Sequence, residues 1–215
     1  MAPRIIPDDD TGRAEAIRIL ERGGIVAFAT DTVYGLAALP PSVPRLFEAK
    51  QRPGEKRIVL LIDDLDQAAE LAALTPAADA LRSLWPGGLT LVLPSRDGDT
   101  AAFRVPDHPT PRALAQALGP LPTTSANLSG EGETRTAAAV AASLGDAVDL
   151  ILDGGETPVG VASTVVDCTV EPVGILRAGA IGWAAVAERL RAAGLAEPAS
   201  DRGKIGPREG GATSA

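Results

Sequence analysis

Five hydroxyl or amide side chains lie within seven residues of one segment, the densest group of possible ligand-binding residues in the chain. The segment runs from Thr123 to Ser129 and follows a short apolar stretch that begins at Leu121. Hydroxyl groups together with backbone N–H groups at a strand-to-helix turn form a concave site for anions. Ordinary turns do not need this density of polar side chains. We therefore predict a binding site for a negatively charged group that includes Ser125 and Asn127.

A basic segment, residues 50–57, has side chains suited to a polyphosphate. Only three of the 20 basic residues are lysines, and two of these, Lys50 and Lys56, lie six residues apart. A Pro-Gly pair between them predicts a turn that lets Lys50, Arg52 and Lys56 converge. Arginine holds a phosphate as a bidentate fork and lysine as a point charge. The alternative is a solvated charge run with no ligand, which is the usual meaning of such a segment.

Two further segments place polar side chains at strand ends. Asp31 and Thr32 follow a strongly apolar stretch that ends at Thr30, and ligands in α/β sheets lie at the carboxyl ends of strands. The alternative is that Thr30 or Asp31 is the N-cap of a short helix. Ser163 precedes another apolar stretch and Arg177 ends a further one. Taken alone, these two are a strand edge and an arginine near a helix start, both of which are common.

The chain lacks the motifs of several common catalytic sites. The nucleophile elbow G-x-S-x-G, the Walker A pattern and G-x-G-x-x-G are absent. Cys168 lies inside an apolar stretch, and His108, the only histidine, is expected to be a turn residue between Asp107 and Pro109. One cysteine and one histidine leave no His/Cys metal cluster and no internal disulfide. The candidate residues therefore suit the positioning of phosphates and the stabilisation of charge rather than covalent catalysis.

Apolar stretches and stretches with helical spacing alternate along the chain, which is typical of α/β proteins. The apolar stretches predict strands at Gly24–Thr30, Ile58–Ile62, Leu89–Leu93, Ala101–Val105, Leu121–Thr124, Leu150–Asp153, Thr164–Cys168 and Val173–Arg177. The helical spacing predicts helices at Gly12–Arg22, Val43–Lys50, Leu65–Leu74, Ala77–Leu84, Pro111–Leu118, Thr136–Leu144 and Ile181–Ala193. Asp64 and Thr136 are expected N-caps, and Gly119 and Gly145 expected helix ends. The third and fourth strands, and the last two, are close enough to form hairpins, so the sheet is expected to be mixed.

Length and composition indicate one domain in a reducing compartment. The 215 residues are 45% apolar and only 3% aromatic, so the core must consist of Ala, Val, Leu and Ile. The net charge of −8 argues against binding nucleic acid through the overall field. Without an apolar leader or a membrane-length apolar run, the protein is expected to be cytosolic. A polar, Gly- and Pro-rich composition predicts that residues 196–215 form a disordered tail after a catalytic domain at residues 5–195.

Seven blocks of sequence, taken in order, resemble the YrdC-like family, the threonylcarbamoyl-adenylate synthases. The blocks are Thr30-Asp31-Thr32-Val33-Tyr34-Gly35-Leu36, Lys50-Gln51-Arg52-Pro53, Trp85-Pro86-Gly87-Gly88-Leu89-Thr90, Arg104-Val105-Pro106-Asp107-His108-Pro109, Thr124-Ser125-Ala126-Asn127-Leu128-Ser129-Gly130, Ser163-Thr164-Val165-Val166-Asp167 and Ile175-Leu176-Arg177-Ala178-Gly179. The resemblance extends from about Ile5 to Leu195. It implies a single-domain, twisted open mixed α/β sheet with flanking helices and a concave, positively charged cleft.

The resemblance also implies a role for each candidate residue. ATP would be held by Lys50, Arg52, Lys56, Ser125, Asn127 and Arg177. L-threonine would be held by Thr32, Arg104, Thr123 and Ser163, with Arg104 pairing with its carboxylate. The implied metal is Mg²⁺ carried on the phosphates, with no all-protein metal site.

The implied reaction joins L-threonine, bicarbonate and ATP. The threonine amine captures bicarbonate or CO2 as a carbamate, which attacks the α-phosphate and expels pyrophosphate. Lys50 and Arg52 would stabilise charge on the phosphates, and Asp31 is a candidate for removing the amine proton. Transfer to tRNA would need downstream tRNA threonylcarbamoyl transferase proteins as partners.

The chain departs from the family pattern at three places. Ala29 replaces a proline, Arg57-Ile58 replaces a Pro-Leu pair, and Leu61 stands where many members carry a threonine-contacting histidine. Two rival functions remain open. A non-catalytic RNA-binding or ribosome-assembly factor of the same fold is disfavoured by the net charge of −8. Carbamoyl transfer in hydrogenase maturation would need acylphosphatase and zinc-finger modules, for which the chain has neither the length nor the cysteines.

Overall fold

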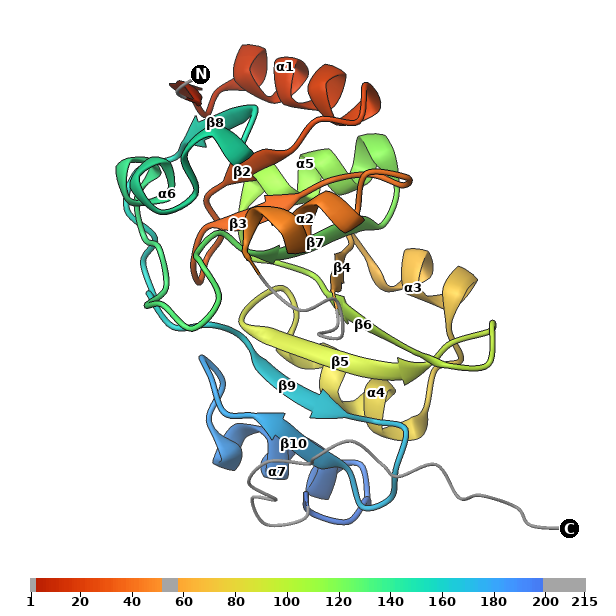
Figure 1. Ribbon diagram of the computed structural model, residues 1–215. Helices are drawn as coiled ribbons and strands as arrows, with labels where there is room; N and C mark the ends of the chain where they lie inside the picture. Colours follow the sequence, from red (N-terminus) through yellow and green to blue (C-terminus); the bar gives the residue numbers. More distant parts are fainter. Residues whose placement is uncertain (1–2, 52–57, 199–215) are drawn as a thin grey trace, which may run out of the picture.

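A single mixed sheet runs through the molecule (Figure 1). The computed structural model describes residues 3–51 and 58–198, and the predicted residues Arg52 and Lys56 lie outside this part. Ten strands pair in the order β1-β8-β2-β3-β7-β4-β6-β5-β9-β10. Their bounds are β1 Arg4–Pro7, β2 Val26–Phe28, β3 Gly35–Ala37, β4 Val59–Leu61, β5 Leu89–Pro94, β6 Thr100–Arg104, β7 Leu121–Ser125, β8 Leu150–Asp153, β9 Thr164–Asp167 and β10 Gly174–Arg177.

The pairing of the strands confirms that the sheet is mixed. β1 and β2 each pair with β8 in parallel, as do β4 with β6 and β5 with β9. The two predicted hairpins are present as the antiparallel pairs β5–β6 and β9–β10. Since neighbours in the sheet are often distant in the sequence, residues from most of the chain meet along one surface.

The predicted helices are present within a few residues of their expected bounds. They are α1 Asp10–Glu21, α2 Pro44–Ala49, α3 Leu65–Leu71, α4 Pro76–Leu81, α5 Pro109–Leu118, α6 Ala137–Leu144 and α7 Trp183–Ala192, with short 3-10 turns η1 Arg82–Leu84 and η2 Gly145–Ala147. Asp64 and Thr136 accept hydrogen bonds from backbone N–H groups in the first turns of α3 and α6, as predicted. Gly119 and Gly145 end α5 and α6, both with positive φ, a conformation that glycine adopts without steric cost.

The core consists mostly of aliphatic side chains on both faces of the sheet, but the aromatic side chains of Tyr34, Phe28 and Phe103 are also fully buried, so the prediction of a purely aliphatic core is wrong. In β5, Leu89, Leu91 and Leu93 pack against a cluster that includes residues of α4 and α7. In β2, Val26 and Phe28 belong to a cluster with α1 and α5, whereas Ala27 belongs to another with α2 and α6. Figure 1 shows α1 and α5 at one end of the sheet and α4 and α7 at the other. Alternation along each strand therefore decides which side chains the helices cover.

The expected tail begins with residues that contact the folded domain. Ala196 lines a small cavity between α4, α7 and the β9–β10 turn. Glu197 pairs with Arg191 of α7 at 3.0 Å between carboxylate oxygen and guanidinium nitrogen. The folded part thus extends slightly beyond the predicted boundary at Leu195, and residues 199–215 lie outside the described part of the chain.

Candidate functional site

A cleft of about 270 Å³ crosses one surface of the sheet and collects most of the predicted site residues. The predicted residues that line it are Lys50, Arg104, Thr123, Ser125, Asn127, Ser163 and Arg177. They are far apart in the sequence. The fold brings them together because β7, β4, β6, β5, β9 and β10 are consecutive in the sheet. The fold thus brings residues assigned to ATP and residues assigned to L-threonine to one cleft, whereas the predicted residues Asp31 and Thr32 are not among those that line it.

Strand alternation explains why one polar face is left open here. The odd-numbered leucines of β5 and Phe103 of β6 face the cluster that contains residues of α4 and α7. Thr90 and Arg104 alternate with these residues, so they face the opposite side, where they line the cleft. Ser163 likewise precedes Thr164, whose hydroxyl donates to the backbone oxygen of Ile181 at 2.6 Å. The helices therefore cover one side of these strands and leave the other for a ligand.

A β-bulge turns Arg177 toward the cleft. In the β9–β10 pair, Ile175 lies opposite Val166 but Arg177 lies opposite Val165, so the register shifts between them. Without this shift Arg177 would share the face of Ile175, which packs against the core. A bulge commonly redirects a side chain in this way. The guanidinium donates from Nε to the Ser163 backbone oxygen and from Nη2 to Ser163 Oγ, both at 3.0 Å.

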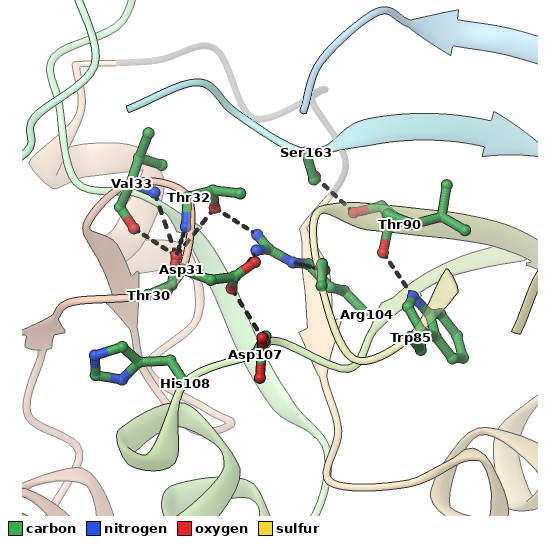
Figure 2. A network of polar contacts seen from close by, with 12 residues as sticks. Thr30, Asp31, Thr32, Val33, Trp85, Thr90, Arg104, Asp107, His108 and Ser163 are labelled. Carbon is green, nitrogen blue, oxygen red and sulfur yellow. Dashed lines mark hydrogen bonds and ion pairs between the residues drawn. The ribbon is translucent and has the colours of Figure 1, made fainter. Parts of the chain in front are cut away.

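Arg104, which lines the cleft, is held in place by three acceptors, of which Figure 2 labels Asp31 and Thr32. Its Nη2 donates to Asp31 Oδ1 at 2.6 Å, its Nη1 to Thr32 Oγ1 at 2.8 Å, and its Nε to the Gly87 backbone oxygen at 3.0 Å. Burial lowers the pKa of Arg104, and the Asp31 carboxylate opposes this shift. A planar donor bound at three nitrogens has little freedom to rotate. The orientation of Arg104 is thus set before any ligand binds.

Asp31 and Thr32 occupy a tight turn between β2 and β3. Thr30 Oγ1 accepts from the backbone nitrogens of Thr32 at 3.1 Å and Val33 at 3.3 Å. The next element is β3, so the alternative that Thr30 or Asp31 caps a helix is wrong. Asp31 Oδ1 is occupied by Arg104 and by the Asp107 backbone N–H at 3.2 Å. This geometry favours a role for Asp31 in orienting Arg104 over the predicted removal of a proton from substrate.

Lys50 anchors the polar segment that follows β7. Its Nζ donates to the backbone oxygen of Asn127 at 2.5 Å, to Asn127 Oδ1 at 3.2 Å and to Ser125 Oγ at 3.3 Å, and it also contacts the Ser125 backbone oxygen. Lys50 is only 3% exposed. For this residue the interpretation as a solvated charge run is therefore wrong. Ser125 and Asn127 are themselves joined at 2.6 Å between Oγ and Oδ1, so cation and acceptors form one unit.

Some cleft residues were not predicted from the sequence. Thr90, Glu131 and Glu133 line the same cleft. Thr90 interrupts an otherwise apolar strand, which is a weak signal because threonine is common in strands. The glutamates lie in the loop of residues 126–136 after β7, where no motif distinguishes them from solvated residues. That loop also separates β7 from α6, so the expected direct strand-to-helix turn is absent.

Leu61 forms an apolar part of the cleft wall beside Arg104. The two residues are paired across β4 and β6, and Leu61 is 3% exposed. This is the position at which the resemblance would place a histidine in many family members. The described cleft thus presents a guanidinium next to a hydrocarbon side chain.

His108 and Cys168 have structural surroundings. His108 Nδ1 accepts from the Thr110 backbone N–H at 3.3 Å and so caps α5, a more specific role than the predicted turn position. Cys168 directly follows β9 and is buried, which raises the pKa of its thiol to about 12. Neither residue lines the cleft. In the described residues, no group of three or more His, Cys, Asp or Glu side chains could hold a metal ion, and no helix there is long and apolar enough to span a bilayer.

Comparison with known proteins gives a family match and several relatives. The family model Sua5/YciO/YrdC, described as "Telomere recombination", matches residues 18–179. A Bacillus subtilis protein named threonylcarbamoyl-AMP synthase is 37% identical over 189 residues, which cover 80% of this chain and 55% of that protein. An Idiomarina loihiensis protein of the same name is 40% identical over 156 residues, covering 65% and 84%.

A solved structure of a Sua5 protein is also similar to this chain. The crystal structure of Pyrococcus abyssi Sua5 complexed with L-threonine superposes with a TM-score of 0.81 at 33% identity, covering 88% of this chain and 60% of that one. The chain spans about half the length of the Bacillus and Pyrococcus relatives, 55% and 53% by sequence alignment. The likeness therefore concerns one part of those longer proteins.

Proposed function

The chain belongs to the Sua5/YciO/YrdC family, and on that premise we propose that it is an L-threonylcarbamoyladenylate synthase. It would convert L-threonine, bicarbonate and ATP into threonylcarbamoyl-AMP and pyrophosphate, for N6-threonylcarbamoyladenosine in tRNA. The relatives named threonylcarbamoyl-AMP synthase support this activity. The observation that carries the proposal is that Arg104 and the Lys50–Ser125–Asn127 unit line the same cleft.

Arg104 is suited to the carboxylate of the amino acid. A guanidinium has five N–H groups, and three of these are used by Asp31, Thr32 and Gly87. Two remain, one on each terminal nitrogen, and a carboxylate accepts such a pair as a bidentate ligand. Thr123 and Ser163, which line the cleft, would supply hydroxyl contacts of the same subsite, and Thr32 would contribute by holding Arg104. The Pyrococcus relative was solved with L-threonine, which supports this choice of substrate.

The Lys50–Ser125–Asn127 unit is suited to ATP. Lys50 contributes a positive charge, and Ser125 and Asn127 contribute polar groups at the end of β7. Arg177 keeps three N–H groups beyond its two bonds to Ser163, so it can donate to a phosphate. We propose that Arg52 and Lys56, which lie outside the described residues, complete this phosphate subsite.

The reaction follows from placing both substrates in one cleft. The threonine amine loses a proton and attacks bicarbonate, releasing water and forming a carbamate. A carbamate oxygen then attacks the α-phosphorus of ATP, and the bond to the β-phosphate oxygen breaks to release pyrophosphate. Positioning of the two reactants accounts for much of such a rate enhancement, and the cations stabilise charge on the phosphates.

We propose that Mg²⁺ binds together with ATP. Glu131 and Glu133 line the cleft, and hard oxygen donors of this kind suit a Mg²⁺ ion that keeps phosphate and water ligands. These are the residues that would hold the ion, through its waters. The ion supplies neutralisation of phosphate charge.

The proposed product is an activated intermediate, so other proteins would be needed to use it. Transfer of the threonylcarbamoyl group to tRNA would require downstream transferase proteins. The net charge of −8 supports weak or no direct binding of nucleic acid by this chain. We propose a cytosolic location, where a buried free thiol such as Cys168 would be stable.

Measuring pyrophosphate release with different amino acids tests the proposed function. The protein would be incubated with ATP, Mg²⁺ and bicarbonate, and with threonine, valine or serine. Valine should fail, because a site that hydrogen-bonds a substrate hydroxyl rejects an analogue without one. Serine should react more weakly, since the lost methyl group is worth roughly 1–3 kcal/mol. Equal release with threonine and valine would rule out the assignment.

A further inference from the structure

Thr90 and Ser163 form a buried pair of hydroxyl groups in the cleft. Their oxygens lie 2.7 Å apart, and the side chains belong to a residue that is fully buried and one that is 4% exposed. Both residues line the cleft. In the part of the chain that the structure describes, the further side-chain hydrogen bond of this pair comes from Arg177 Nη2 to Ser163 Oγ. The pair thus accepts one hydrogen bond from Arg177, and both of its side chains line the cleft.

The protons of this pair can be counted. Arg177 has no acceptor, so Ser163 Oγ must accept from it. The two hydroxyl groups bring two protons, and one of these lies in the 2.7 Å contact between them. The other has no described protein acceptor, whichever of Thr90 and Ser163 donates to its neighbour. Buried hydroxyl groups normally have a partner, so a ligand oxygen is expected to accept this proton.

The position of the pair indicates which ligand oxygen it meets. Thr90 precedes Leu91, Arg104 follows Phe103, and these two middle residues are paired across β5 and β6. Thr90 and Arg104 therefore lie at the same end of this strand pair and both line the cleft. Within the described residues, two N–H groups of Arg104 have no protein acceptor, so they are available to an anionic oxygen pair. A hydroxyl proton beside that guanidinium would donate to the same class of oxygen.

We propose that Thr90 is a specificity-determining and positioning residue, which fixes the Ser163 hydroxyl so that the pair donates one hydrogen bond to a carboxylate-type oxygen of the amino-acid substrate. That oxygen belongs either to the substrate carboxylate or to the carbamate formed on its amine. This inference rests on the proposed function. We assign Thr90 as the donor in its contact with Ser163, so the Ser163 proton meets the substrate oxygen and Thr90 takes no part in bond formation.

Replacing Thr90 with valine tests the proposal, because valine keeps the shape and removes the hydroxyl. Thr90→Val should raise the KM for threonine, or that for bicarbonate if the carbamate is the acceptor, by about tenfold or more. The KM for ATP should change by less than about twofold. Thr90→Ser, which retains the hydroxyl, should restore the substrate KM to near the unmodified value. Thr164→Val is the matched control, since it removes a buried strand hydroxyl that faces Ile181.

A double substitution separates this role from a structural one. If Thr90 acts through Ser163, adding Thr90→Val to Ser163→Ala should cause little further change in the substrate KM. Additive effects, an unchanged KM in Thr90→Val, or an equal rise in Thr164→Val would each overturn the proposal while leaving the proposed function intact. Failure of the unmodified protein to release pyrophosphate with threonine would overturn the proposed function, and this inference with it.

Discussion

Asp31 and Arg104, 73 residues apart in the sequence, form an ion pair with 2.6 Å between Oδ1 and Nη2. The two side chains are 12% and 7% exposed. The same carboxylate oxygen accepts the backbone N–H of Asp107, which follows β6. The pair therefore joins the turn after β2 to the end of β6, and it holds the guanidinium that we propose as the carboxylate-binding group.

Asp31→Asn should impair both stability and substrate binding. Removing one partner of a buried ion pair leaves the other charge uncompensated, so the free energy of unfolding should fall by about 3 kcal/mol. The KM for threonine should rise by about tenfold or more, with less change for ATP, because Arg104 loses its orientation. Chemical denaturation and initial-rate kinetics would measure the two effects.

Asp79→Asn is the control for that substitution. Asp79 pairs with Arg82 at 3.0 Å, but these side chains are 64% and 54% exposed. An exposed pair of this kind contributes about 0–1 kcal/mol. An Asp31→Asn variant as stable and as active as Asp79→Asn would contradict the orienting role.

Lys50→Met should lower both the stability of the protein and its rate of adenylate formation. Methionine keeps an unbranched apolar stem but removes the donor that contacts Ser125 and Asn127, leaving buried oxygens without this partner. We expect the free energy of unfolding to fall by roughly 2 kcal/mol, and adenylate formation to fall by about a hundredfold. Arg45→Met in α2 is the control, since the Arg45 side chain is exposed and its ion pair with Asp149 should contribute only about 0–1 kcal/mol. Equal stability and activity in the two variants would contradict the assignment.

His108 should make the protein less stable in mild acid. Burial lowers the pKa of His108, an effect that the Asp8 and Asp31 carboxylates partly oppose. The unfolded chain therefore binds a proton more readily than the folded protein. This contribution to stability is fully present above the unfolded pKa of about 6.5 and is lost as the pH falls through the lower folded value.

Replacing His108 with asparagine tests that pH dependence. Asparagine can still cap α5 but has no proton to bind. Denaturation between about pH 7 and pH 5 should show a smaller loss of stability in His108→Asn than in the unmodified protein. The same slope in both would show that other groups cause the loss.

Cys168 should be unreactive in the folded protein. Burial raises the pKa of this thiol to about 12, and only the thiolate reacts readily with alkylating reagents. Iodoacetamide at about pH 8 should therefore label the protein only after denaturant is added, as followed by mass spectrometry. Rapid labelling of the native protein would show that the thiol is accessible.

Most of the strands and helices could be predicted from the sequence, but two strands could not. β1 and β3 contain only a few residues, and β3 begins with Gly35, so neither shows a period. They form because long-range pairing with β8 and β7 holds them. The strand order depends on such pairings, which local patterns do not encode.

The residues that line the cleft were easier to predict from the sequence than the contacts between them. Dense hydroxyl groups identified Ser125 and Asn127, and a pattern in seven blocks identified Arg104 and Ser163. Thr90 ends one of the seven blocks, but the sequence indicates no role for it, because its side chain is ordinary for a strand and its proposed role comes from its contact with Ser163. The placement of Arg177 depends on a bulge, which the sequence does not reveal.

Isotope-labelled bicarbonate offers the most direct test of the proposed enzyme activity. The protein would be incubated with ¹³C-bicarbonate, ATP, Mg²⁺ and L-threonine, and the nucleotide products analysed by mass spectrometry together with pyrophosphate. We predict threonylcarbamoyl-AMP that carries the labelled carbon, formed in equal amount to pyrophosphate and absent when valine replaces threonine. Intact ATP with no labelled adenylate, in a folded protein that instead binds RNA with a strong salt dependence, would contradict it.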